Sequence, residues 1–417
     1  MDALRIQGGA ALRGELEVSG SKNAALPIMA AALLSEGESV LERVPDLADV
    51  RTLARVLETL GARVERSGTR VRIDGRNVGS VEAPYELVRT MRASILVLGP
   101  LLARFGHARV SLPGGCAIGA RPIDQHLRGL AKLGAHIEIE HGYVEARAER
   151  LRGAEVVFAA PTVGGTENLM LAASLAQGTT VLHNAAREPE VVDLARALTK
   201  MGAEISGAGS ERIVIHGAQQ LFPFEHRVIP DRIEFGTFLV AGAMAGDGLT
   251  IRAGGPEHQM ALIEKLRAAG AALEIDAGTV TVGAANPPAP LDVQTAPYPG
   301  FPTDMQAQLM ALLAIADGTS SISETIFENR FMHVAELNRL GANIRVEGGH
   351  ASVHGVPRLS GSTVMATDLR ASASLVLAGL VAEGDTHLRR VYHLDRGYEH
   401  IEDKLRSVGA SIQRVTE

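Results

Sequence analysis

The chain has 417 residues, 46% of them hydrophobic and 21% charged, which predicts a folded globular protein with two or three domains. Its net charge of -7 excludes a general attraction to nucleic acid or to an anionic membrane surface, so local basic residues must hold any anionic ligand. The longest apolar stretches, 25–34 and 93–103, are too short to cross a bilayer. The first residues lack a secretory signal and the single cysteine cannot form an internal disulfide, so we expect a cytoplasmic protein without membrane insertion.

One sequence unit recurs six times along the chain. Taken in order, each copy predicts a strand, a buried Ala/Leu/Met-rich helix closed by a glycine, a β-branched strand, an amphipathic helix ending at Gly-Ala, and a hairpin of two strands. In the third copy these elements begin with a strand in 153–160 and a helix closed by Gly178. The glycines of the Gly-Ala pairs recur about 70 residues apart, at positions 61, 134, 202, 270, 341 and 409.

The two ends of the chain complement each other in this pattern. The sixth copy stops before its last strand, and the chain begins with a segment that resembles the strands that close other copies. We therefore expect the N-terminus to supply the missing strand. The six copies then group into two lobes, one of residues 22–229 and the other of residues 1–21 plus 230–417. Repetition by itself does not distinguish an enzyme from a non-catalytic scaffold.

The starts of the first helices carry the features that differ between copies. Ser21, Thr166 and Asp368 are candidate N-caps. Lys22, Arg92 and Arg370 oppose the helix macrodipole unless an anion or acid lies opposite them. Solvated surface charge would explain any one of these cations, but three at equivalent positions suggest a shared anionic ligand.

Residues 111–126 break the repeat and predict a glycine-rich loop around the only cysteine, Cys116. Most lone cysteines are buried and inert, but a thiol on such a loop, five residues before Arg121, favours a reactive, partly ionised group. The sequence has no Cys/His cluster with zinc spacing, no Walker-type loop and no dinucleotide-binding glycine motif opening a helix. We therefore expect neither a metal nor a cofactor.

Eight segments, in order along the whole chain, carry a resemblance to a known family. They are SGSKNAALPI (19–28), RTMRASI (89–95), LPGGCAIGARPIDQH (112–126), HNAAREPEVVD (183–193), PTDMQAQ (302–308), IFENRF (326–331), ATDLRAS (366–372) and LDRGYE (394–399). With them the chain resembles the UDP-N-acetylglucosamine enolpyruvyl transferases. The resemblance implies two inside-out α/β barrel domains, each of three βαβαββ repeats, with the active site in the interdomain cleft. It also implies phosphoenolpyruvate and UDP-N-acetylglucosamine as substrates, a step in peptidoglycan synthesis and inhibition by fosfomycin, and it points to no obligate protein partner.

The resemblance also implies a role for individual residues. Cys116 corresponds to the cysteine that adds to phosphoenolpyruvate and donates a proton, and Asp304 to the carboxylate near the sugar hydroxyl. Asp304 alternatively only caps its helix. The remaining residues implied to bind substrate are Lys22, Asn23, Arg92, Arg121, Pro122, Ile123, Asp124, Gln125, Thr162, Val163, Gly164, Ile326, Arg330, Arg370 and Arg396.

The sequence differs from some family members at two positions, and one other activity is compatible with the same repeats. Leu96 and Ala160 stand where some relatives carry Trp and Lys, so we expect altered substrate contacts but the same reaction. An enzyme of the same fold that acts on shikimate 3-phosphate would share the repeats and the anion-binding residues. The cysteine loop and the segment 183–193 favour the UDP-sugar instead.

Overall fold

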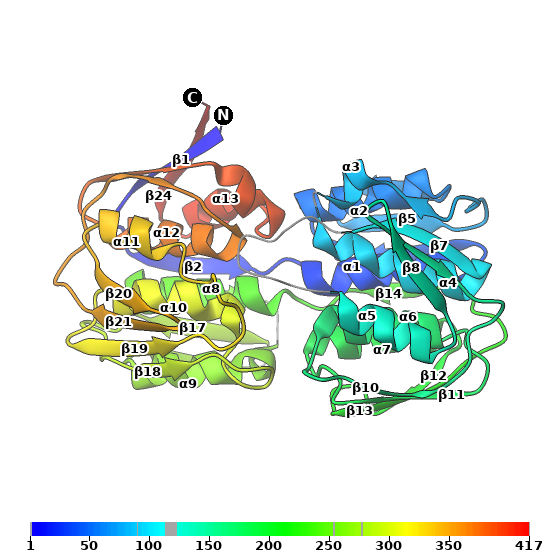
Figure 1. Ribbon diagram of the computed structural model, residues 1–417. Helices are drawn as coiled ribbons and strands as arrows, with labels where there is room; N and C mark the ends of the chain where they lie inside the picture. Colours follow the sequence, from blue (N-terminus) through cyan, green and yellow to red (C-terminus); the bar gives the residue numbers. More distant parts are fainter. Residues whose placement is uncertain (1, 90, 113–122, 253–254, 277, 417) are drawn as a thin grey trace. The chain divides into compact units, whose positions relative to one another are not determined.

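The computed structural model describes residues 2–416 except 90, 113–122, 253–254 and 277 (Figure 1). The described residues form two compact units. We call residues 20–229 the N-terminal unit, and residues 2–19 together with 230–416 the C-terminal unit. Each unit has its own hydrophobic core.

The N-terminal unit contains three four-stranded sheets. In each sheet the first two strands run parallel, and the other two form an antiparallel hairpin whose second strand pairs beside them. In spatial order the sheets are β14 (Glu225–Arg227), β3 (Glu38–Glu42), β5 (Arg70–Asp74) and β4 (Arg63–Ser67); β6 (Glu82–Ala83), β7 (His107–Ser111), β9 (Tyr143–Arg147) and β8 (His136–Glu140); and β10 (Glu155–Val157), β11 (Thr179–His183), β13 (Arg212–His216) and β12 (Glu204–Ser206).

The C-terminal unit repeats the same sheet pattern three times. Its sheets are β2 (Leu12–Glu17), β15 (Gly246–Arg252), β17 (Thr279–Gly283) and β16 (Ala272–Asp276); β18 (Asp292–Gln294), β19 (Thr319–Ser323), β21 (His350–His354) and β20 (Asn343–Glu347); and β22 (Thr363–Met365), β23 (Asp385–Arg389), β1 (Asp2–Gln7) and β24 (Ser411–Thr416).

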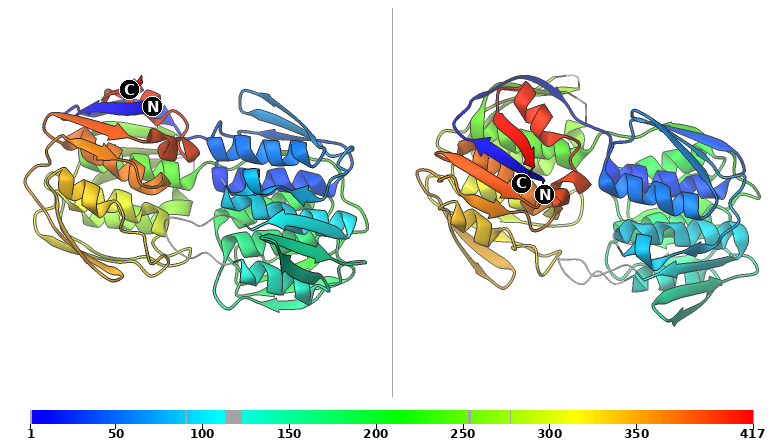
Figure 2. Two further views of the ribbon diagram at one scale, coloured as in Figure 1. Left: turned by 45° about the horizontal axis from the view of Figure 1, so that its top comes forward. Right: turned by 90° about the horizontal axis from the view of Figure 1, so that it is seen from above.

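Six nearly fully buried helical segments occupy the interiors of the units, three in each, with the sheets outside them (Figure 2). In α8, every residue from Ile233 to Met244 is buried. A helix that is apolar all round must be enclosed by other elements, which places it at the centre. The six segments are α1 (Lys22–Ala31) with η1 (Ala32–Leu34), η2 (Arg92–Val97) with α4 (Leu98–Phe105), α6 (Val163–Ala173), α8 (Arg232–Ala245), η4 (Thr303–Met305) with α10 (Gln306–Leu313), and α12 (Leu369–Val381).

The second helix of each repeat is amphipathic or only partly buried, as its sequence predicts. These helices are α2 (Ala48–Thr59), α5 (Asp124–Lys132), α7 (Pro189–Lys200), α9 (Met260–Ala268), α11 (Val334–Arg339) and α13 (Ile401–Ser407). Three short helices, α3 (Tyr85–Val88), η3 (Pro256–Gln259) and η5 (Val391–Arg396), complete the set. Helices inside and sheets outside confirm the expected inside-out α/β arrangement; in the part of the chain that the structure describes, the sheets stay separate rather than closing into one barrel.

Each Gly-Ala pair closes its amphipathic helix in the same way. At the end of α2, Gly61 N donates to Glu58 O over 3.0 Å and Ala62 N donates to Leu57 O over 3.0 Å, which is the Schellman pattern. The six glycines have φ between 92° and 105°, a region that residues with a Cβ rarely adopt. The Gly-Ala pair that recurs in the sequence is therefore the C-terminal cap of each amphipathic helix.

The chain crosses between the units twice, and at each crossing the last strand pairs within the unit that the chain leaves. β2 pairs in the C-terminal unit with β15, yet the helix that follows it, α1, belongs to the N-terminal unit. Conversely, β14 pairs in the N-terminal unit with β3, and the following α8 belongs to the C-terminal unit. The lobe boundaries expected from the sequence, after residue 21 and after residue 229, fall between each of these strands and the helix that follows it.

The N-terminal strand completes the last sheet, as expected. β1 lies between β23 and β24 and pairs antiparallel with both, so the two chain ends lie side by side (Figure 1). Ile6 of β1 lies opposite Thr386 on one side and Ile412 on the other. The strand thus takes the fourth place that the sixth repeat lacks.

Two local expectations need correction. Thr166 lies inside α6, and Thr162 is its N-cap, accepting from Gly165 N at 3.3 Å. The buried helix of the second repeat begins as the 3-10 segment η2, and α4 starts at Leu98. This start places Pro100 in the first turn of α4, where a missing N–H breaks no helical bond.

Among the residues that the structure describes, no helix is long and apolar enough to cross a membrane.

One carboxyl group on the buried helix α6 predicts a pH dependence of stability. Burial, with added repulsion from Glu190 and Glu188, raises the pKa of Glu167 well above its ordinary value. A raised pKa in the folded state means that stability falls as pH rises from the ordinary Glu pKa of about 4.5 towards the raised one, by about 1.4 kcal/mol per pH unit. Glu167→Gln removes this loss. We expect the free energy of unfolding of the variant to match wild type near pH 4 and to exceed it increasingly towards neutral pH in urea titrations.

The matched control is Glu264→Gln on α9, where the side chain is exposed. Its stability difference from wild type should stay nearly constant over the same pH range. Equal pH profiles for Glu167→Gln and wild type would contradict a proton bound to Glu167.

Candidate active site

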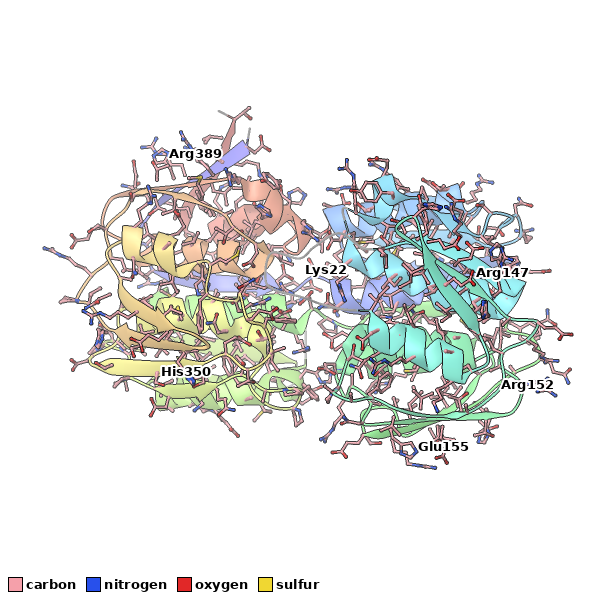
Figure 3. All side chains as sticks on the ribbon, viewed as in Figure 1. Lys22, Arg147, Arg152, Glu155, His350 and Arg389 are labelled. Carbon is pink, nitrogen blue, oxygen red and sulfur yellow. The ribbon has the colours of Figure 1, made fainter. Side chains whose placement is uncertain are left out.

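Lys22, the first residue of α1, is a buried cation with a buried carboxylate beside it. Its Nζ lies 3.2 Å from Asp49 Oδ2 on α2, with the two side chains only 10% and 7% exposed. Ser21 caps the helix by accepting from Ala24 N at 3.3 Å, as expected. Lys22 lies at the end of α1, whereas Arg147, Arg152 and Glu155 lie on the outer sheets and loops of the same unit (Figure 3). The sequence did not identify Asp49 as the acid that offsets this cation at a helix N-terminus.

Asn23 follows Lys22 in the first turn of α1. Pro27, inside the same helix, has no N–H to donate to the Asn23 carbonyl four residues earlier. The backbone oxygen of Asn23 therefore accepts no helical hydrogen bond from residue 27.

Two of the segments implied to bind substrate, around Gln125 and around Thr162, lie together in the N-terminal unit. The Gln125 side chain bridges them, because its Oε1 accepts from Ala159 N at 2.8 Å and its Nε2 donates to Ala160 O at 3.1 Å. Ile123 and Asp124 form the start of α5, and Thr162, Val163 and Gly164 form the start of α6. The backbone N–H groups of a helix start are suitable donors for an anionic ligand.

A buried amide joins these starts to the segment that carries Arg92. Asn168 Nδ2 donates to Ile95 O at 3.2 Å and lies 3.1 Å from His126 Nδ1, and its Oδ1 accepts from Gly99 N at 2.8 Å. Because the amide nitrogen can only donate, His126 Nδ1 accepts and the imidazole proton is on Nε2. Arg92 is half-buried at the start of η2. Sequence reasoning missed Asn168, which lies within an apolar helical run and has no motif of its own.

Asp304 lies in the C-terminal unit between two buried guanidinium groups. Arg330 Nη2 is 2.6 Å from its Oδ1, and Arg370 Nε is 3.4 Å from its Oδ2. The arginine side chains are 4% and 3% exposed, and that of Asp304 is 30% exposed. The alternative that Asp304 caps its helix is wrong, because η4 has Pro302 at its N-cap and no side-chain cap. Two adjacent cations stabilise negative charge on this carboxylate.

Arg370 keeps its charge despite complete burial. Burial by itself would lower its pKa, but Tyr398, Asp304 and Asp231 outweigh this effect and raise it. Asp368 caps α12 as expected, accepting from Arg370 N at 2.8 Å and Ala371 N at 3.0 Å. The surface-charge interpretation is therefore wrong for both Arg370 and Lys22, since each is buried beside an acid.

Glu324 connects the segment of Ile326 to the segment of Asp304. Its Oε1 accepts from Ile326 N at 2.8 Å and from Phe327 N at 3.2 Å, and its Oε2 accepts from Thr303 Oγ1 at 2.9 Å. Glu324 is 8% exposed. The sequence did not single out Glu324, because a glutamate at a strand end is usually solvated.

Arg396 is the last residue of η5, and its neighbour Asp395 is held by Arg414 of β24. Arg414 Nη2 and Nη1 lie 2.6 Å and 3.0 Å from the two oxygens of Asp395, and its Nε lies 2.6 Å from Glu402. These contacts of Arg414 connect η5 to β24 of the last sheet and to α13.

Three predicted residues, Cys116, Arg121 and Pro122, lie outside the described residues. The others separate into one set in each unit: Lys22, Asn23, Arg92, Ile123, Asp124, Gln125, Thr162, Val163 and Gly164 in the N-terminal unit, and Asp304, Ile326, Arg330, Arg370 and Arg396 in the C-terminal unit. The described ranges contain no group of three or more His, Cys, Asp and Glu side chains that could hold a metal ion.

Comparison with known proteins places the chain in a family. Residues 6–405 match the family model described as EPSP synthase (3-phosphoshikimate 1-carboxyvinyltransferase). The chain belongs to the enolpyruvyl transferase family. A family member from Anaeromyxobacter sp. (strain Fw109-5), named UDP-N-acetylglucosamine 1-carboxyvinyltransferase, is 63% identical over 99% of both chains. One of the same name from Anaeromyxobacter sp. (strain K) is 62% identical over the full length of both.

Solved structures of enolpyruvyl transferases have the same fold. NikO from Streptomyces tendae is 30% identical with a TM-score of 0.90, covering 100% of this chain and 99% of that one. EPSP synthase from Acinetobacter baumannii has a TM-score of 0.77 at 17% identity, with full coverage of both chains, and this likeness concerns the fold.

The buried ion pair at the start of α1 leads to a stability prediction. Asp49→Asn removes the carboxylate that lies 3.2 Å from the buried Lys22 ammonium, and we expect a loss of about 3 kcal/mol in the free energy of unfolding. The control, Asp46→Asn, removes an exposed partner of Arg51 and should change stability by less than about 0.5 kcal/mol. Urea unfolding of both variants measures the difference, and equal effects would contradict a stabilising role of Asp49.

Proposed function

We propose that this protein transfers the enolpyruvyl group of phosphoenolpyruvate to the 3-hydroxyl of UDP-N-acetylglucosamine and releases phosphate, a step of peptidoglycan synthesis. The observation that carries the proposal is 63% identity over 99% of both chains with a relative named UDP-N-acetylglucosamine 1-carboxyvinyltransferase. Such an enzyme works in the cytoplasm, where both substrates are available.

The proposed substrates are anionic, and the residues assigned to them are suited to anions. We assign Lys22, Arg121 and Arg396 to the phosphate and carboxylate of phosphoenolpyruvate, with Arg92, Arg330 and Arg370 as further cationic support. Asn23, residues 121–125, residues 162–164 and Ile326 are assigned to the UDP-sugar. In support, Lys22 is buried at a helix start, and Gln125 hydrogen-bonds the segment before Thr162.

In the proposed reaction, Cys116 delivers its thiol proton to the methylene carbon of phosphoenolpyruvate. The sugar 3-hydroxyl oxygen bonds to the adjacent carbon and gives its proton to Asp304, which forms a tetrahedral intermediate that still bears the phosphate. The new methyl group then returns a proton to the Cys116 thiolate as the carbon–oxygen bond to phosphate breaks, so the double bond re-forms on the sugar ether. The phosphate leaves with the bonding electron pair and takes up the proton from Asp304. Each proton transfer contributes about 10² to 10⁴ in rate.

The contacts of Asp304 suit this role. Its oxygens lie 2.6 Å from Arg330 and 3.4 Å from Arg370, so the carboxylate is held in a fixed orientation. A base that is oriented before the substrate arrives saves the entropic cost of aligning it during the reaction. Lys22 and the arginines add charge stabilisation as phosphate leaves.

Shikimate 3-phosphate is the second candidate acceptor, because the matching family model carries that activity in its description. The two acceptors differ in size and charge, and the full-length identity of 62–63% to enzymes named for the UDP-sugar favours the first.

Phosphate release tests the choice of acceptor. With phosphoenolpyruvate present, we expect phosphate to appear with UDP-N-acetylglucosamine and not with shikimate 3-phosphate, in a colorimetric assay. The opposite preference would select the second candidate, and no release with either would overturn an enzymatic function of this class.

Asp304→Asn keeps the size of the side chain but removes its ability to accept a proton as a carboxylate. We expect kcat to fall by about 10² to 10⁴ while the variant remains folded by circular dichroism. Asp317→Asn, a substitution in the loop between α10 and β19, provides the control and should leave kcat unchanged. Normal turnover in Asp304→Asn would exclude Asp304 as the base.

Cys116→Ser replaces the thiol by a far weaker acid, and multiple turnover should be nearly abolished. Fosfomycin, an epoxide, should alkylate wild type at Cys116 and leave Cys116→Ser unmodified, as measured by mass spectrometry of the intact proteins. A wild-type peptide labelled at another residue would refute the role of this thiol.

A further inference from the structure

The buried carboxylate of Glu324 binds the turn in which the chain leaves β19. Glu324 comes directly after this strand, and its Oε1 accepts from Ile326 N at 2.8 Å and from Phe327 N at 3.2 Å. Thr295 Oγ1 donates to the same oxygen at 2.9 Å. Glu324 is 8% exposed, so these bonds are largely shielded from water. One carboxylate oxygen therefore holds the start of the segment 326–330 in place.

The second oxygen of the same carboxylate binds a different part of the C-terminal unit. Glu324 Oε2 accepts from Thr303 Oγ1 at 2.9 Å. Thr303 is the first residue of η4, and Asp304 is the second. Glu324 therefore holds both the turn after β19 and the residue that immediately precedes Asp304.

A second contact joins the same two segments. Arg330 Nη2 donates to Asp304 Oδ1 at 2.6 Å. The Cζ atom of Arg330 also lies 5.6 Å from the centroid of the Phe327 ring, and Phe327 is one of the residues whose backbone N–H binds Glu324. The segments 303–304 and 324–330 are thus joined twice, by Glu324 with Thr303 and by Arg330 with Asp304. The first contact fixes the separation at which the second one forms.

The chemistry of the carboxylate suits it to this supporting role. All four of these hydrogen bonds run towards Glu324, because a carboxylate only accepts. Hydrogen bonds to an ionised acceptor are shorter and stronger than those between neutral groups. Burial strengthens them further and makes an unsatisfied partner costly. Removal of one donor therefore changes the position of its segment rather than merely exchanging one partner for water.

We propose that Glu324 is a positioning residue for the enolpyruvyl transfer: it holds Thr303 and the turn that leads to Arg330, and it thereby fixes the orientation of the Asp304 carboxylate. This inference rests on the proposed function, in which Asp304 accepts the proton of the sugar hydroxyl. A misplacement of about 1 Å at a reacting group lowers a rate by about a hundredfold, so a carboxylate that acts only through its neighbours controls the rate through geometry.

The test is Thr303→Val, which keeps the shape of the side chain and removes the hydroxyl that reaches Glu324. We expect kcat to fall by about tenfold to a hundredfold, with KM for either substrate within about threefold of wild type. The matched control is Thr319→Val at the start of β19, which removes an exposed hydroxyl 3.0 Å from His354 Nδ1 and should leave kcat unchanged. Rates are measured well below the unfolding midpoint of each variant, so that loss of stability does not lower the active fraction.

A second variant shows whether the two residues act as one support. Glu324→Ala removes the acceptor of the Thr303 hydroxyl, so it should lower kcat at least as much as Thr303→Val does. The double variant should then lose little more than Glu324→Ala by itself, because both changes break the same connection. Independent multiplication of the two losses, or a kcat for Thr303→Val within twofold of wild type, would overturn the proposal. If Glu324→Ala does not fold, the kcat of Thr303→Val decides.

A crystal structure of Thr303→Val gives a readout that does not depend on turnover. We expect the Asp304 carboxylate to be displaced from Arg330 Nη2 relative to a wild-type crystal structure, and an unchanged contact would overturn the inference. Wild-type phosphate release in the same assay shows separately whether the proposed function holds. If wild type releases none, the proposed function fails, whereas a failed inference leaves wild-type turnover intact.

Discussion

The nearly complete burial of six central helical segments is the constraint on which the rest of this structure depends. A helix that is apolar all round cannot face water, so sheets and amphipathic helices must enclose it. Any polar group on such a helix must then be satisfied inside the protein. Lys22 with Asp49, Asn168 with His126, and Arg370 with Asp304 and Tyr398 are the results. Most of the described candidate site residues lie at or near the starts of these helices, where backbone N–H groups are also available.

The strand exchange at the two passages of the chain has a direct consequence for the site. The strand β2 pairs in the C-terminal unit, and Lys22 begins α1 of the N-terminal unit a few residues later. Ser19, between them, is held within the C-terminal unit by Glu234, which accepts from its backbone nitrogen at 2.6 Å, and by Lys404, which donates to its hydroxyl at 2.7 Å. The segment that leads to Lys22 is therefore fixed at its start by a buried network, and the second passage is likewise fixed near Ile229 by Asp193 at 3.2 Å.

In the proposed reaction few side chains react directly, and several others hold them in position. Asp304 would accept a proton, and Arg330 and Arg370 lie beside its two carboxylate oxygens, while Glu324 holds the neighbouring Thr303. Supports of this kind act through short hydrogen bonds in a buried environment, where each bond is stronger than in water and an unsatisfied group is costly. The same low polarity raises the pKa of Glu167 and of Tyr398, so the core holds protons that exposed carboxyl and hydroxyl groups would release more readily.

The sequence by itself determined the repeat, the six helix stops and the completion of the last sheet by the N-terminal strand, because these follow from local patterns of apolar residues and glycines. The resemblance to the family supplied the inside-out α/β class. The eight family segments identified Asp304, Arg330 and Arg370 as site residues, and the structure brings these three together. Only the tertiary structure decided which acids and amides support them. Asp49 and Asn168 are distant in sequence from the groups they hold and carry no pattern of their own, and Glu324 lies 21 residues from Thr303, whose hydroxyl it binds. Their partners follow from how helices and sheets pack, which short-range periodicity does not encode.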